Sequence, residues 1–130
     1  NDEGTDYRLV SGAPVVNTWT DAAACLVLGN TNAQAAILQV HMSTTKNTTQ
    51  AIDVITFLRP KGTTWAAVYA SNPVPYLRNQ MDINDSNQTR TMAIGGMLIC
   101  PLGTSNTIQY YFSSTGSSHV LTILQLGLII

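Results

Sequence analysis

The sequence predicts an all-β protein, an antiparallel β-sandwich of jelly-roll-like character with about seven to eight strands. Short apolar runs rich in β-branched residues alternate with turn signals roughly 8–12 residues apart, a spacing typical of this class. No window repeats apolar residues at helical spacing with strong helix formers between them. The 130 residues fit a single β-sandwich domain spanning 1–130. Residues 1–6 are expected to form a flexible tip or an inter-subunit arm, and the start without Met reads as a processed end or an excerpt.

The first half of the chain supplies three expected strands. Residues 7–16 form the first, and Pro14 places it at a sheet edge or ends its regular pairing. Residues 22–28 are read as a short strand because they lead directly into the turn-like run 29–32. Residues 35–44 alternate most clearly, which predicts a half-buried strand. Its expected inner face consists of Ala36, Leu38, Val40 and Met42.

Two further strands and an irregular region follow. Residues 51–59 are apolar at nearly every position, and residues 63–70 form another expected strand after the turn at 60–62. Residues 71–91 are read as irregular, because Pro73 and Pro75 break any strand ladder. Residues 90–102 return to strand, and Gly95-Gly96 suggests a bulge or a close backbone approach.

The last stretch, residues 106–130, is expected to be one long hairpin. Its first arm places Ile108, Tyr110 and Phe112 on one face, whereas its second arm, residues 119–130, is apolar at both parities. A strand of that kind needs cover on both faces, and one core covers only one of them. With Val120, Leu124, Leu126 and Leu128 assigned to the core, the residues left for a neighbouring subunit are Leu121, Ile123, Ile129 and Ile130.

The composition favours contact with other protein chains. Charged residues make up only 10% of the chain, so little charge has to be desolvated when two surfaces meet. The net charge of −1 gives no support to nucleic acid or an anionic membrane as a partner. No apolar run approaches the roughly 20 residues that a membrane-spanning helix needs.

No catalytic, cofactor or metal motif stands out. His41 and His119 have no carboxylate or Cys at ligand spacing, and Asp82 with Asp85 lacks the closing Glu and the Gly of a calcium loop. No Gly-x-Ser-x-Gly and no phosphate-binding glycine loop is found, so neither an enzyme nor a cofactor is expected. Cys25 and Cys100 are read as buried core residues, with a disulfide between them as the alternative.

The aromatic side chains supply a second candidate site. Tyr76 lies between a stiff, proline-containing loop and Arg78, and Tyr and Arg are both enriched at protein interfaces. Trp65 is a further candidate for a sugar-stacking or interface role. Tyr76, Arg78 and Trp65 are therefore the expected ligand-contact residues.

Several short motifs resemble those of small β-sandwich domains on phage virions, namely capsid decoration proteins and C-terminal modules of tail-fibre or tail-tip chains. They are Trp19-Thr20-Asp21, Ala35-Ala36-Ile37-Leu38-Gln39-Val40, Phe57-Leu58-Arg59-Pro60-Lys61-Gly62, Ile108-Gln109-Tyr110 and the closing run 120–128. The resemblance implies a non-enzymatic virion-surface protein, a capsid decoration or cement subunit or a fibre-associated subunit. The partners it implies are copies of the same chain, with a trimer favoured, and other virion proteins. The alternative is a receptor- or carbohydrate-binding module that contacts a cell-surface glycan.

Overall fold

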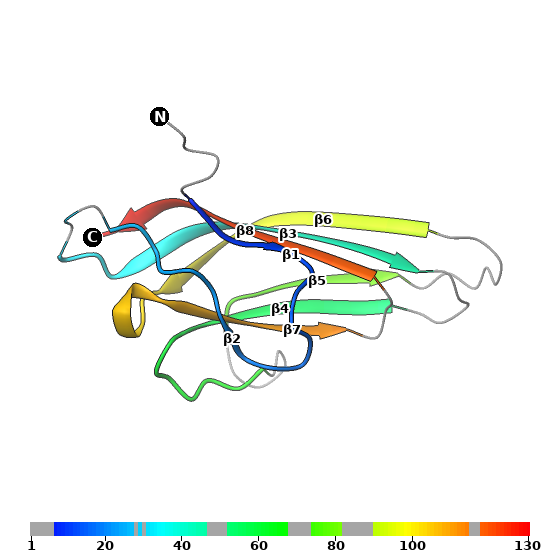
Figure 1. Cartoon of the computed structure of the whole chain (residues 1–130), viewed down its shortest axis with the longest axis horizontal. Coiled ribbons are helices and arrows are strands. Elements are labelled where there is room, and N and C mark those ends of the chain that lie inside the picture. The colour runs from blue at the N-terminus through cyan, green and yellow to red at the C-terminus, as the bar shows by residue number, and fades with distance from the viewer. Residues whose placement is uncertain are drawn as a thin grey trace.

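The protein folds as two packed antiparallel sheets of four strands each, which confirms the predicted all-β sandwich (Figure 1). The structure is a computed structural model that describes residues 7–27, 29, 31–46, 52–67, 74–81, 90–114 and 118–130. The first sheet contains, in spatial order, β1 (Arg8–Gly12), β8 (Ser118–Ile129), β3 (Ala35–Lys46) and β6 (Arg90–Pro101). The second sheet contains, in order, β2 (Thr20–Asp21), β7 (Ile108–Ser114), β4 (Ile52–Pro60) and β5 (Tyr76–Met81). A short 3₁₀ turn, η1 (Thr104–Asn106), precedes β7, and no helix in the described part of the chain is long and apolar enough to cross a membrane.

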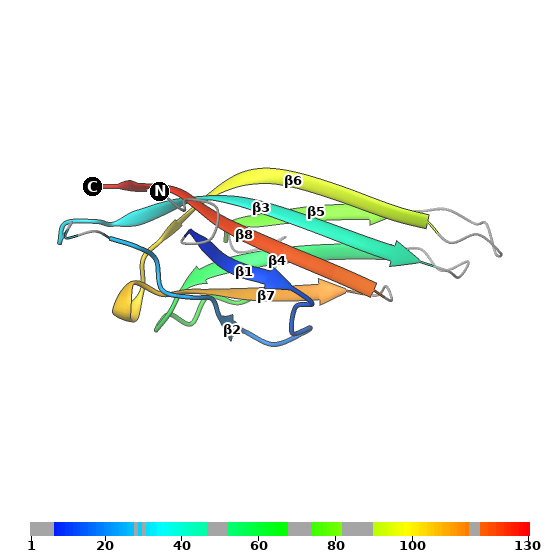
Figure 2. The ribbon, with the colours of Figure 1, turned by 45° about the horizontal axis from the view of Figure 1, so that its top comes forward.

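The strand order is that of a jelly roll. Strand β1 pairs with β8, β2 with β7, β3 with β6 and β4 with β5, as if one long hairpin had been rolled up. Most strands that follow each other in the chain therefore belong to different sheets. The two sheets lie face to face in both views (Figures 1 and 2).

The core fills the space between the sheets. The alternation predicted for residues 35–44 is confirmed: Ala36, Leu38, Val40 and Met42 of β3 point inward and are fully buried, whereas Gln39 and His41 are exposed on the other side. Ile108, Tyr110 and Phe112 of β7 also point inward, as predicted. One polar contact lies within this core, where the Thr56 hydroxyl donates to the Met42 Sδ at 2.9 Å.

The predicted terminal hairpin is wrong. Strands β7 and β8 follow each other in the chain, but β7 pairs with β2 and β4, whereas β8 pairs with β1 and β3 in the other sheet. The two strands therefore lie in different sheets. Alternation within each strand is a local property, but which strand pairs with which is set by the rolled topology, so adjacency in sequence misled the prediction.

The prediction of which β8 side chains point toward the core is also wrong for most of the strand. Leu121 and Ile123 are 0% and 1% exposed and belong to this chain's own core, so they are not available to a neighbouring subunit. Ile129 and Ile130 are exposed, as the interface prediction requires. Because both parities of β8 are apolar, the sequence alone gave no means of choosing the inward one.

A β-bulge separates the two halves of β8. Ile37 of β3 is opposite Gly127, and the next residue, Leu38, is opposite Gln125, so Leu126 is the extra residue. The bulge reverses the parity, so Leu128 turns toward the core, as predicted, while Leu126 is exposed.

Three other expectations need correction. Of the expected strands 22–28 and 63–70, residues 22–27 form no strand and residues 63–67 run irregularly outside the second sheet, while residues 28 and 68–70 lie outside the described residues. The strand β5 lies inside the region predicted to be irregular, because Pro73 and Pro75 precede it without interrupting it. At Gly95-Gly96 the second of the two predicted alternatives holds: the ladder between β3 and β6 has no bulge, and a Cβ on Gly96 would lie 3.0 Å from Leu77 Cδ1 of the opposite sheet, which is a close approach.

A buried glutamine fixes the irregular segment 22–27 against β8. The Gln125 side chain, 6% exposed, accepts a hydrogen bond from the Leu26 backbone N–H and donates one to the Leu26 carbonyl, both at 2.8 Å. One side-chain amide thus supplies both hydrogen bonds that a neighbouring strand would provide.

We expect Gln125→Ala to lower the free energy of unfolding by about 1–3 kcal/mol, because it leaves polar groups of Leu26 without partners in a partly buried site. Urea denaturation followed by circular dichroism measures the change. Gln39→Ala, on the exposed face of β3, is the control and should change stability by less than about 0.5 kcal/mol. Equal stability of the two variants would contradict the role of Gln125.

Candidate interaction surfaces

The outer face of the first sheet carries a contiguous group of exposed apolar side chains, which we call the apolar face. It consists of exposed Met97 and Ile99 on β6 and exposed Leu126 and Ile129 on β8, with half-buried Ile37 of β3 between them; Ile130, just after β8, is also exposed. The strand register places these residues together, because Ile99 is opposite Ile37 and Ile37 is opposite Gly127. Gly127 has no side chain, and a Cβ there would lie 3.8 Å from Ile37 Cδ1.

The exposure of this face is unusual for an isolated domain. Met97 is 67% exposed, Leu126 53% and Ile99 52%. Single exposed apolar residues are common, but several on neighbouring strands mark an interaction site.

Charge is sparse over the same outer face. The described outward side chains of β3, β6 and β8 include no carboxylate and no Lys; their polar members are neutral residues and His41. The guanidinium of Arg8, opposite Leu124, lies at the β1 edge of the sheet. A partner with a similar surface would therefore displace water without desolvating many ions.

The outer face of the second sheet differs because this chain covers much of it. Ile55 and Phe57 of β4 point outward but are buried, in a second cluster with Val74. Trp19, Ala67 and Tyr111 pack against that cluster. Strand β4 is apolar on both faces, as the sequence indicated, and both faces are covered within the chain. Trp19 therefore belongs to this second cluster rather than to the main core.

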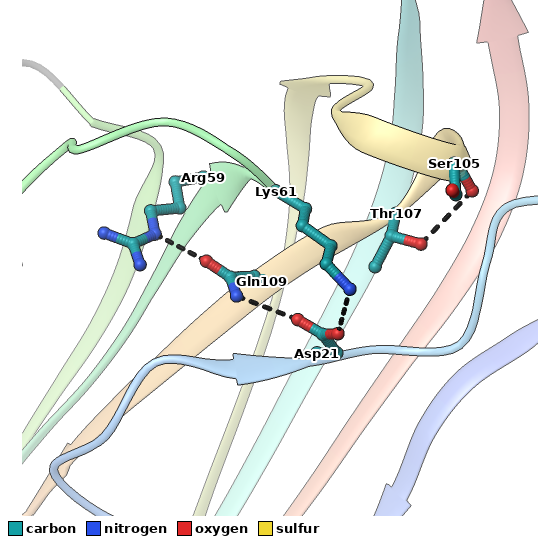
Figure 3. Close-up of polar contacts among 6 residues, drawn as sticks. All are labelled: Asp21, Arg59, Lys61, Ser105, Thr107 and Gln109. Carbon is teal, nitrogen blue, oxygen red and sulfur yellow. Dashed lines mark hydrogen bonds and ion pairs between the residues drawn. The ribbon is translucent and has the colours of Figure 1, made fainter.

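A chain of polar contacts runs across one end of this outer face (Figure 3). Arg59 Nε donates to Gln109 Oε1 at 2.7 Å, and Gln109 Nε2 donates to Asp21 Oδ1 at 2.8 Å. Lys61 Nζ binds the other Asp21 oxygen at 2.6 Å. These side chains meet because Asp21, Gln109 and Arg59 are opposite one another on β2, β7 and β4. The Arg59 guanidinium also lies 4.1 Å from the centre of the Trp19 ring, a cation–π contact.

The hydrogen bonds of this face shift the pKa of its carboxylates. The hydrogen bond from Lys61, and then that from Gln109, lowers the pKa of Asp21 below its ordinary value. The bidentate pair from Arg78 lowers the pKa of Asp53, with Nε to Oδ1 at 2.9 Å and Nη2 to Oδ2 at 2.8 Å. Each carboxylate is thus held in its charged form and binds a cation of the same face.

The three predicted ligand-contact residues all lie on this side of the molecule. Tyr76 and Arg78 point outward from β5, opposite Phe57 and Ile55. The Tyr76 ring is 40% exposed and packs at a tilt on Phe57, with ring centres 6.2 Å apart. Trp65 is 36% exposed, and its backbone carbonyl accepts a hydrogen bond from Arg59. The structure therefore brings Tyr76 and Arg78 to one strand face and joins Trp65 to the polar chain through Arg59.

The two histidines have different surroundings. His41 is exposed on the outer face of the first sheet. The His119 ring contacts the Ser114 hydroxyl at 2.7 Å through Nε2 and the Thr44 hydroxyl at 3.2 Å through Nδ1. Thr44, a neutral residue, stands at His119 Nδ1, where a hydrolase triad has a carboxylate. Among the described residues no three His, Cys, Asp or Glu side chains gather to hold a metal ion, and Asp82 and Asp85 lie outside those residues.

Both cysteines are free and buried, which matches the core-residue interpretation rather than the disulfide. Burial raises the pKa of the Cys25 thiol to about 11 and that of Cys100 to about 12. Both are protonated at neutral pH and therefore poor nucleophiles.

Met97, Ile99 and Leu126 are exposed, although the sequence pattern did not indicate them as surface residues. The sequence did contain a sign of this exposed surface. In the second half of residues 90–101, as in 119–130, consecutive residues are apolar, so apolar side chains project from both faces of the strand. The Arg59–Gln109–Asp21 chain gave no local signal, because its members lie 88 residues apart at the extremes.

Comparison with models of known protein families finds no match to this chain, and comparison with curated proteins finds none either.

The Asp53–Arg78 pair makes stability depend on pH. The pKa of Asp53 is lower in the folded chain than its ordinary value of 3.8, so the stabilisation is present above that value and is lost as the pH falls below it. We expect Asp53→Asn to be less stable than the wild type at pH 7 and the difference to shrink below about pH 4.

Urea denaturation at a series of pH values measures this difference. The control is Gln80→Ala, opposite Asp53 on β5, which removes no titratable group and should differ from the wild type by the same amount at each pH. A pH-independent gap for Asp53→Asn would contradict the assignment.

Proposed function

We propose that this protein is a non-enzymatic structural subunit that acts by packing its apolar face against neighbouring copies of the chain. The observation that carries the proposal is the set of exposed apolar side chains on β6 and β8, with half-buried Ile37 of β3 between them, on a sheet face with almost no charge. Removing one such side chain fully from water contributes roughly 1.5–3 kcal/mol, so a few of them support specific association. The assembly we propose is a homo-oligomer, and the sequence resemblance favours a trimer.

We place this subunit on a virion surface, as a capsid decoration or cement subunit or as a fibre-associated subunit. Support comes from the sequence resemblance to phage virion domains and from the jelly-roll strand order, which also occurs in viral capsid domains. Both are arguments from likeness of fold and motif. Immunogold labelling of intact particles with an antibody to this chain tests the placement, and unlabelled shells and tails would contradict it.

We expect the wild type to self-associate as its concentration rises, and Leu126→Lys to weaken that association about tenfold or more. Leu126 is the exposed bulge residue of β8, so a Lys there is tolerated in the monomer but puts a charge into the contact. Sedimentation velocity over a concentration series measures both effects. Thr64→Lys adds the same charge at an exposed position of the segment 63–67 and serves as the control. A wild type that stays monomeric throughout would contradict the proposal.

A second candidate function is glycan binding by the outer face of the second sheet. The specific observation is that the rings of Tyr76 and Trp65 are partly exposed beside a band of charged and amide side chains. Sugars are recognised by such combinations, in which a ring stacks on the apolar side of the sugar and polar groups bind its hydroxyls. Lectin domains share the jelly-roll fold, which is again an analogy.

If the second candidate holds, the wild type binds a defined glycan on an array and Tyr76→Ala loses about tenfold or more in signal. Met97→Ala, exposed on the opposite side of the molecule, is the matched control and should bind like the wild type. Binding of no glycan by the wild type, or equal binding by all three proteins, would rule out this function.

A further inference from the structure

Strand β6 forms one edge of the first sheet. It pairs along its whole length with β3, from Arg90 opposite Lys46 to Pro101 opposite Ala35, and no other strand among the described residues pairs with it. It borders the sheet in both views (Figures 1 and 2). In an antiparallel ladder every second residue of an edge strand directs its N–H and C=O away from its partner. Among the described residues, no backbone hydrogen bond reaches β6 from that side.

The other three sheet edges carry the features by which proteins prevent strand pairing. Strand β1 is 5 residues long, with Arg8 and a register shift at its start, and β2 has 2 residues. Strand β5 has 6 residues and the ion pair between Arg78 and Asp53 on its outer face. Short strands, charges and bulges are the usual protection of an edge.

Strand β6 lacks each of these features over residues 91–100. It is 12 residues long, its ladder with β3 has no register shift, and residues 91–100 include neither a charged residue nor a Pro. A long, regular, uncharged edge is a template for pairing with another strand. Its outward side chains, Met97 and Ile99, belong to the apolar face, so pairing here would extend that face.

We propose that β6 pairs antiparallel with β6 of a second copy across a twofold axis, which joins the two first sheets into one sheet of eight strands. The inference rests on the proposed self-association but assigns it to the strand edge and to a twofold dimer, in place of the trimer that the sequence resemblance favours. A second copy suits this edge because the contact is isologous and residues 91–101 bring no charge to oppose an identical strand.

The sequence of β6 also selects a register. Side chains directly opposite in an antiparallel pair lie on the same face, and the uncharged segment 91–101 has Gly96 at its centre. In the register centred on Gly96, Met97 is opposite the partner's Gly95 and Ile99 is opposite the partner's Ala93. Each large outward side chain thus meets a small one.

Hydrogen exchange tests the pairing directly, because it reports on backbone N–H groups rather than on apolar contact. We expect alternate amides of residues 91–100 to exchange about tenfold or more slowly at high protein concentration than at low concentration, whereas amides of the β1 edge do not change. NMR resolves the individual amides. Equal exchange of β6 at both concentrations would overturn the proposal.

Hydrogen exchange of the Leu126→Lys variant distinguishes pairing of the β6 edge from packing of the apolar face. Leu126 lies on β8, two strands away from the β6 edge. Protection of β6 that persists in this variant supports edge pairing even where face packing is lost. Association of the wild type without β6 protection overturns edge pairing and leaves the apolar face as the contact.

A disulfide test checks the register. Ala93→Cys combined with Ile99→Cys should give a covalent dimer on mild oxidation, since these positions are opposite one another in the proposed register. Both side chains are exposed, and the native Cys25 and Cys100 are buried. Ser11→Cys, exposed on the β1 edge, is the control. Dimers formed equally by the control would contradict the β6 pairing.

Discussion

A sandwich of two sheets has four sheet faces, and its core covers only two of them. The remaining two faces are treated differently by this chain. The outer face of the second sheet receives Trp19, Ala67 and Val74, which bury Ile55 and Phe57 of β4. The outer face of the first sheet receives no such cover from the described residues, although Met97 and Leu126 project from it. The two outer faces of the sandwich are therefore unequal: one is largely covered within the chain, and the other leaves apolar side chains open to water.

The sequence carried the fold class and the clearest strands, because the alternation of β3 and the inner residues of β7 is a local pattern. It did not carry the pairing of β7 and β8, which depends on how distant segments roll together. It also did not show which side chains of β8 point inward, since Leu121 and Val120 are both apolar. In the structure Leu121 and Gln125 point inward, and the bulge at Leu126 reverses the alternation after them. Of the four residues predicted to face a neighbour, Ile129 and Ile130 are exposed, whereas Leu121 and Ile123 are buried in this chain's own core.

The two outer faces suit different partners. The first sheet offers apolar side chains and backbone groups along β6, so it can associate with a surface or strand of similar character. The second offers aromatic rings among side chains whose charges are already paired, such as Asp53 with Arg78, so it suits a polar ligand held by weak contacts. Because the faces are on opposite sides of the sandwich, occupying one leaves the other accessible.

Two methionines illustrate the same contrast at the level of a single atom. The sulfur of Met42 is enclosed in the core and already accepts a hydrogen bond from Thr56, so solvent oxidants do not reach it. The side chain of Met97 is open to water on the apolar face. Conversion of its thioether to a sulfoxide would add a polar oxygen there without disturbing the interior. Oxidation of Met97 would therefore make the apolar face more polar and weaken its apolar contacts, and it would leave the fold intact.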